Sequence, residues 1–96
     1  MVFGMREALN MLFEEGLENV FERHRVLAAA THAAVEVWGQ AGTLSLNAVE
    51  PIERSNGVTT ILTSDGIDAG HFRDICRDEM MVGLGGGLGD LSGKAF

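Results

Sequence analysis

Apolar side chains recur at intervals of three and four residues through the first part of the chain. The series is Met5, Leu9, Leu12, Phe13, Leu17, Val20, Phe21, Leu27, Ala34, Val35 and Trp38. Such spacing places the side chains on one face of a helix. Gly16 interrupts the series directly after two glutamates. A glycine costs about 1 kcal/mol relative to alanine inside a helix but suits the residue just past a helix end. The pattern predicts two helices, at about 4–15 and 17–38, with Gly39 and Gly42 ending the second.

After these glycines the pattern becomes that of extended structure. Leu44 and Leu46 alternate with polar residues, which predicts a short strand. Pro51 and the Ser55-Asn56-Gly57 triplet mark a loop or turn. The segment 58–63 is rich in β-branched residues and predicts a second strand.

The last third of the chain combines a helix with a glycine-rich loop. Asp68 is a candidate N-cap for a helix at about 69–79. Its inward side chains are expected to be Phe72, Ile75 and Cys76. We expect a further strand at 80–84, a loop through the glycine-rich stretch 83–93, and the start of another extended segment at 94–96. No internal repeat or interdomain linker interrupts this order.

Composition narrows the possible functions. The chain has 96 residues, 7 basic against 14 acidic side chains and a net charge of −7. A surface that binds nucleic acid or anionic lipid needs clustered basic residues, so we expect neither partner. One cysteine excludes a disulfide framework and a cysteine-based zinc site. The apolar runs are too short for a membrane span and the first residues lack the order of a signal peptide, so we expect a soluble, cytoplasmic protein.

The apolar content is high for so short a chain. Hydrophobic residues make up 46% of the sequence, and there are also 13 glycines. Together they exceed the usual share of about 45–50%. A compact alanine-rich core would account for this surplus. We favour the alternative, in which these side chains pack against further protein.

The run GLGGGLGD invites comparison with phosphate-binding loops. It does not match G-x-G-x-x-G in any register, and Gly93-Lys94 lacks both the first Walker glycine and the following Ser or Thr. A phosphate loop should also open a helix, whereas a strand-like segment follows here. We therefore expect a conformational role for these glycines, with nucleotide binding as a minor alternative.

No residue pattern indicates catalysis. His24 and His32 lie more than two helical turns apart, too far to share a metal without a third ligand. His71 lies near the acidic residues Asp65, Asp68 and Asp74. There we favour helix capping and solvation over metal binding. Cys76 is expected to be a buried thiol, and Trp38 to lie in the core or in an interface. From the residues alone we predict no catalytic, cofactor-binding, substrate-binding or metal-binding side chain.

A resemblance emerges from the order of several longer motifs. REAL is followed by EEGLENVFERHR, then by VTT with DGID, and finally by GLGDLSGKAF. Together they resemble the C-terminal part of class V pyridoxal-phosphate aminotransferases, the branch that contains alanine–glyoxylate and serine–glyoxylate aminotransferases. The resemblance extends from Phe3 to Phe96.

The resemblance implies a fold. Members of this family are homodimers of the aspartate-aminotransferase architecture, with a large cofactor-binding domain and a small C-terminal domain. This chain would form part of the small domain, of the α+β class, with helices on one face of a short, mainly antiparallel sheet that is incomplete at its C-terminus. Residues 1–38 would be connecting helices broken near Gly16, and residues 39–96 would supply the strands, one helix and the glycine-rich loop.

The resemblance also implies which functional groups this chain lacks. The Schiff-base lysine and the aspartate beside the pyridine nitrogen belong to the large domain. Lys94 matches the lysine of the family's glycine loop instead. The arginine that binds the substrate carboxylate follows the segment matching 94–96 in an Arg-Ile-Gly context, so it lies outside this sequence. Phe3 stands where family members often place a tyrosine near the partner's cofactor phosphate, and that role is not carried over.

Two functions follow as hypotheses. In the first, the chain is part of an aminotransferase that exchanges an amino group between alanine or serine and glyoxylate or pyruvate. Pyridoxal phosphate would serve the whole enzyme, whereas the chain alone would be inactive and bind none. Its partners would be the large domain and a second subunit, and the isolated chain would self-associate. In the second, it is a small acidic helical module for protein–protein interaction, without catalysis.

Overall fold

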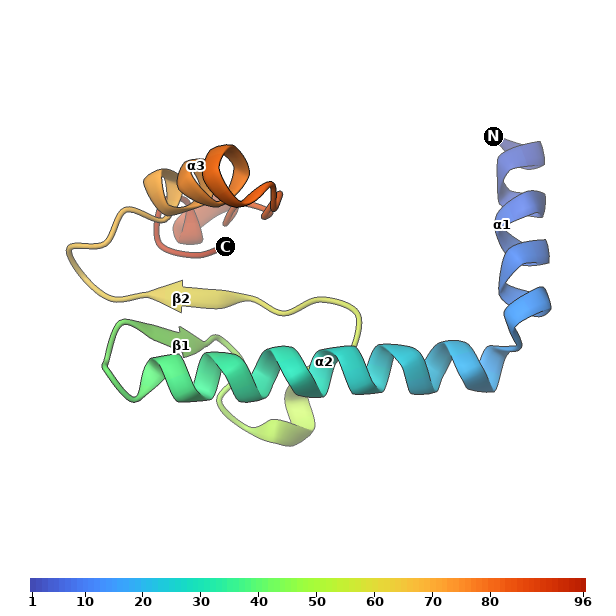
Figure 1. Ribbon diagram of the computed structural model, residues 1–96, viewed down its shortest axis with the longest axis horizontal. Coiled ribbons are helices and arrows are strands. Elements are labelled where there is room, and N and C mark those ends of the chain that lie inside the picture. Colours follow the sequence, from blue (N-terminus) through green and yellow to red (C-terminus); the bar gives the residue numbers. More distant parts are fainter.

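The computed structural model describes residues 1–96 as three helices and a small sheet (Figure 1). The helices are α1 (Val2–Glu15), α2 (Leu17–Gly39) and α3 (Ala69–Met80), and the strands are β1 (Leu44–Leu46) and β2 (Ile61–Thr63). Short 3₁₀ turns lie at Pro51–Glu53 and Gly89–Leu91. This arrangement confirms the α+β class expected from the sequence.

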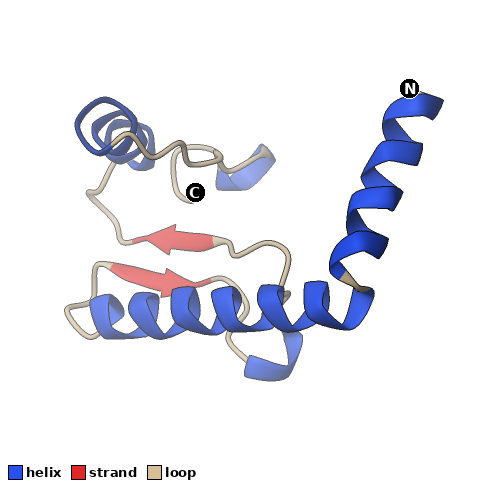
Figure 2. Ribbon diagram, turned by 45° about the vertical axis from the view of Figure 1, so that its right-hand side comes forward, coloured by secondary structure: helices blue, strands red, loops and turns tan.

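The first two helices meet at a sharp elbow. Gly16 is the only residue between them and adopts φ 92°, in the left-handed region that favours glycine. Its backbone N–H still donates to Leu12 O at 2.9 Å, which closes the last turn of α1. In Figures 1 and 2, α1 leaves the end of α2 as a separate arm. The predicted break at Gly16 is confirmed.

Helix α2 packs against β1. Its buried residues are Val20, Ala28 and Val35, and α2 runs alongside β1 (Figure 2). This face is narrower than the apolar pattern suggested, because Leu27 and Trp38 are 58% and 57% exposed. Trp38 is therefore not a core residue of this chain. Of the two expected positions, core or interface, only the interface remains.

The sheet has two strands and the beginning of a third. β1 and β2 pair antiparallel, with Leu44 opposite Thr63. On the other edge of β2, Leu62 forms an antiparallel bridge to Ala95, and Ile61 and Phe96 exchange two backbone hydrogen bonds of 2.8 and 3.0 Å. The extended segment expected at 94–96 is thus present.

The second strand is shorter than its sequence predicts. Segment 58–63 was expected to be extended throughout, but β2 begins only at Ile61. The Ser55 hydroxyl accepts the N–H groups of Gly57 and Val58, at 3.0 and 3.4 Å, and so holds the preceding segment in a turn. The β-branched composition of the segment predicts a strand but does not show that the Ser55 turn precedes it so closely.

Helix α3 begins and packs as predicted. The Asp68 carboxylate accepts the N–H of Gly70 at 2.9 Å and caps its N-terminus. Cys76 is buried and Ile75 is half-buried. The Phe72 ring stacks on Phe96 with ring centroids 4.9 Å apart, which fixes α3 beside the C-terminal segment.

The strand predicted at 80–84 is absent. Helix α3 continues through Met80, and Met81 then takes a left-handed conformation with φ 58°. Val82 N–H donates to Cys76 O at 2.9 Å, a helix-ending bond that reverses the chain direction. Arg73 Nε donates a hydrogen bond to the Leu84 carbonyl at 3.1 Å. The segment after Met81 therefore packs beside α3 and pairs with no strand.

Candidate functional site

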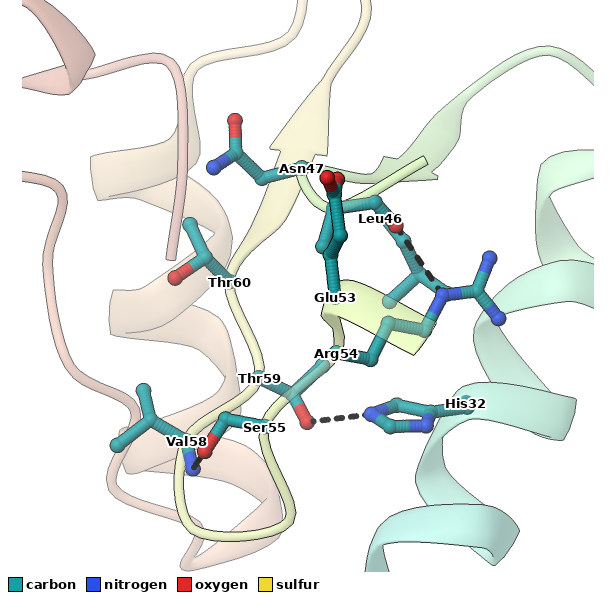
Figure 3. A pocket seen from close by; sticks show the side chains of 10 residues that line it. His32, Leu46, Asn47, Glu53, Arg54, Ser55, Val58, Thr59 and Thr60 are labelled. Atoms are coloured by element: carbon teal, nitrogen blue, oxygen red, sulfur yellow. Dashed lines mark hydrogen bonds between the residues drawn. The ribbon is translucent and has the colours of Figure 1, made fainter. Parts of the chain in front are cut away.

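A small polar pocket lies where α2, the end of β1 and the segment before β2 meet (Figure 3). Its volume is about 140 Å³. Ten residues line it: His32, Leu46, Asn47, Ala48, Glu53, Arg54, Ser55, Val58, Thr59 and Thr60. Across it, the His32 Nε2 atom lies 3.2 Å from the Thr59 hydroxyl. The sequence indicated no such pairing, because 27 residues separate the two side chains.

Arg54 is one of the residues that line this pocket, and each of its three guanidinium nitrogens donates a hydrogen bond. Its guanidinium donates to Ala48 O and Val49 O at 3.1 Å each and to the Glu36 carboxylate at 2.7 Å. These bonds tie the loop after β1 to α2. Only 14% of the Arg54 side chain is exposed, so the charge-assisted bonds satisfy a largely buried cation. The arginine therefore stabilises the loop and offers no free fork to a ligand.

The pocket has neither the size nor the chemistry of an active site. Ligand sites commonly measure about 300–1,000 Å³, well above this volume. The Ser55 hydroxyl accepts backbone N–H groups, and His32 faces Thr59, so no general base lies on the serine. The contact between His32 and Thr59 across the pocket is structural, since it joins α2 to the segment that leads into β2.

The glycine-rich loop serves the sheet. After the 3₁₀ turn at Gly89–Leu91 the chain becomes extended and opens no helix, unlike a phosphate-binding loop. Gly87 N–H donates to Ala95 O at 3.1 Å, and Thr63 N–H donates to Lys94 O at 2.8 Å. These contacts place the loop beside the third extended segment, in keeping with the predicted conformational role.

Lys94 lies outside both of the pockets described for this chain. Its side chain is exposed, and it lines neither the pocket at His32 nor the open groove along α2 and β1. A lysine that holds pyridoxal phosphate needs an enclosing cavity that excludes water and orients the ring. The residues present here do not fit that group.

The remaining candidate side chains are dispersed. His24 Nδ1 lies 2.8 Å from Val20 O within its own helix, whereas His71 is exposed and Asp68 is occupied as a cap. No three histidine, cysteine or acidic side chains converge in a way that could hold a metal ion. Cys76 is a buried free thiol, as expected.

Helix α1 exposes a group of large apolar side chains. Helix α1 buries no residue at all. Phe3, Met5 and Phe13 are 85%, 61% and 65% exposed, and Met11 lies at 62%. Monomeric proteins rarely expose so many large apolar side chains on one element, and such patches mark contact surfaces. Of the apolar residues in the helical pattern of this segment, Met5, Leu9 and Phe13 are exposed and Leu12 is half-buried.

The acidic run around the elbow faces solvent, as its like charges predict. Glu14 and Glu18 are exposed. Glu15 pairs with Arg23, and Glu22 pairs with Arg25. Hydrogen bonds from these arginines lower the pKa of the Glu15 and Glu22 carboxyls, and the positive charge of the arginines acts in the same direction.

Known proteins resemble this chain over its whole length. It is 44% identical over 96 residues to serine–glyoxylate aminotransferase from Methylorubrum extorquens, of which it covers 23%. It is 35% identical over 96 residues to L-aspartate–glyoxylate aminotransferase from Paracoccus denitrificans, again covering 23%. The crystal structure of an alanine–glyoxylate aminotransferase from Nostoc sp. matches 94% of this chain with a TM-score of 0.79 and 36% identity, over 22% of that protein.

Three further facts delimit the comparison. The chain spans less than a quarter of the length of these relatives. No family model matches it. None of its helices combines the length and the apolar character that crossing a membrane requires.

Proposed function

Because the chain belongs to the glyoxylate aminotransferases of the class V pyridoxal-phosphate family, we propose that it forms part of the small domain of such an enzyme. The intact protein would transfer an amino group between serine or alanine and glyoxylate or pyruvate. The observation that carries this proposal is the combination of 44% identity over all 96 residues with a shared fold. When bound, pyridoxal phosphate would supply the electron sink for amino transfer.

Glyoxylate is the acceptor we favour. The relatives are named for three different amino donors, serine, L-aspartate and alanine, whereas glyoxylate is common to all three names. The donor is therefore the less constrained part of the proposal. Within this chain, the glycine loop and residues 94–96 would act by holding the sheet edge in register, and no residue here would touch the reacting atoms.

A segment exchange tests this function. The 96 residues would replace the aligned stretch of the Methylorubrum extorquens enzyme, and glyoxylate-dependent consumption of serine, alanine and aspartate would be measured separately. We expect the chimera to retain glyoxylate-dependent transfer with serine or alanine. A chimera that folds and binds pyridoxal phosphate but transfers no amino group to glyoxylate would contradict the proposal.

By itself the chain is proposed to be inactive and to hold no cofactor. Its one lysine, Lys94, is exposed and lines neither the pocket at His32 nor the groove along α2 and β1. Mixing the chain with pyridoxal phosphate should give no saturable absorbance change that depends on this lysine. Stoichiometric binding that disappears in Lys94→Ala would overturn this part of the proposal.

The exposed apolar arm supports an interaction role. We propose that α1 and the exposed side of α2 are covered by the large domain and a second subunit in the homodimer, and that the isolated chain self-associates. Covering one large apolar side chain stabilises by about 1.5–3 kcal/mol, so several on α1 give a strong drive to associate. Sedimentation equilibrium over a wide concentration range should show an oligomer. A cooperatively unfolding monomer would favour the second candidate function, a stand-alone interaction module.

A further inference from the structure

The elbow between α1 and α2 is bridged by a specific set of polar contacts. Only Gly16 separates the helices, and its φ of 92° sets the direction change. The Asn19 side-chain amide donates to Glu15 O at 2.9 Å, which satisfies a carbonyl at the end of α1. An alanine Cβ at Gly16 would lie 3.2 Å from the same amide, so the corner is closely packed.

The Glu15 side chain reaches across this corner to Arg23. Arg23 Nε donates to one carboxylate oxygen at 2.7 Å, and Arg23 Nη2 donates to the other at 2.9 Å. Residues eight apart in one straight helix would lie about 12 Å apart along its axis. The bidentate contact is therefore a consequence of the bend, and the planar fork of arginine restricts the angles at which it forms.

Little else restrains the arm. Helix α1 has no buried residue, and in Figures 1 and 2 its backbone meets that of α2 only at the elbow. We propose that the Glu15–Arg23 pair is a clasp that fixes the angle between α1 and α2. By fixing that angle it sets the direction in which the apolar side chains of α1 are presented.

The chain contains a matched control for this clasp. Arg25 binds Glu22 through the same two-bond geometry, at 2.8 and 2.6 Å, but both residues belong to α2. Losing either pair removes one exposed bidentate ion pair from the molecule. Only the loss of Glu15–Arg23 removes a contact between two helices.

The experiment measures the angle directly. Nitroxide labels would be placed on cysteines introduced at Asn10 in α1 and Ala30 in α2, both exposed, in a Cys76→Ala background. Pulsed dipolar spectroscopy gives the distribution of distances between the labels. The chain is measured below the concentration at which sedimentation shows self-association, so that no second copy covers α1, and an excess of unlabelled protein removes any remaining intermolecular distances. The variants are Arg23→Gln, the control Arg25→Gln, and the exchange Glu15→Arg with Arg23→Glu.

We expect the parent and Arg25→Gln to share the same main distance and the same width of the distance distribution. Arg23→Gln should broaden the distribution at least twofold while helix content and unfolding temperature stay within error, since exposed ion pairs contribute little to stability. The exchanged pair should narrow it again. A distribution in Arg23→Gln as narrow as that of the control, or one that the exchanged pair leaves broad, would overturn the proposal.

Discussion

Substituting Gly87 by alanine should disrupt the third extended segment. The added Cβ would overlap Leu91 O and lie 2.8 Å from Leu91 C, both backbone atoms that no side-chain rotation can move away. Relief requires the loop to shift. That shift would break the bond from Gly87 N–H to Ala95 O, now 3.1 Å long, beside the bridge between Ala95 and β2.

The magnitude follows from two effects. Forcing an extra carbon into a filled space costs about 1–3 kcal/mol. Losing the backbone hydrogen bond adds about 0.5–1.5 kcal/mol. We therefore expect Gly87→Ala to lower the free energy of unfolding by about 1.5–4.5 kcal/mol, out of about 5–14 kcal/mol for a domain of this length.

A second glycine of the same loop supplies the control. A Cβ at Gly85 would meet no atom within 4 Å, and its φ does not lie in the left-handed region. Alanine there should raise the free energy of unfolding by about 0.4–1 kcal/mol, because it restricts the unfolded chain. Urea unfolding of both variants should thus give midpoints displaced in opposite directions.

Hydrogen exchange locates the effect. In Gly87→Ala the amides of Ile61 and Phe96, which bond each other across the sheet edge, should exchange faster, whereas those in the middle of α2 should change less. Equal midpoints for the Gly87 and Gly85 variants would refute the steric reasoning. So would a loss of protection spread evenly over the chain.

Three further predictions rest on single contacts. Asp68→Ala should lower the free energy of unfolding by about 1 kcal/mol, measured by urea denaturation, because it removes the cap on α3. Val35→Ala should cost about 1.5–3 kcal/mol from lost methyl burial and cavity formation, whereas Val37→Ala should change little, since the two residues are 1% and 61% exposed. The Glu15 carboxyl has a lowered pKa, mainly through the hydrogen bond from Arg23, so its contribution to stability is present above the ordinary carboxyl pKa and is lost as the pH falls through the lowered value. In Arg23→Gln an NMR titration of Glu15 should return this pKa toward its ordinary value, and an unchanged pKa would contradict the assignment.

Local sequence was a good guide where one residue decides the structure. Gly16 ended α1 and Asp68 began α3, because a left-handed φ and a cap are properties of single positions. It failed at Met80–Leu84, where the apolar run suggested a strand. There the outcome depended on Met81 turning left-handed and on Arg73 binding Leu84 O, contacts that local composition does not encode.

The candidate site shows the same division. The sequence indicated that the glycine loop would shape the chain rather than bind phosphate, and that Cys76 would be buried. It gave no sign that His32 faces Thr59 or that Arg54 ties two carbonyls to Glu36, since those partners are brought together only by the packing of α2 on β1. The surplus of apolar residues was visible from composition, but not which of them would stay exposed.

By itself, the sequence determined the helices, their breaks and caps, the acidic surface and the family resemblance, because each depends on residue type and short-range spacing. Only the tertiary structure decided the narrow buried face of α2, the length of β2, and the clasp from Glu15 to Arg23 across the elbow. These features depend on side chains that meet after the chain bends. Contacts of that kind are set by the geometry of the whole fold, and no local pattern of hydrophobic and polar residues specifies them.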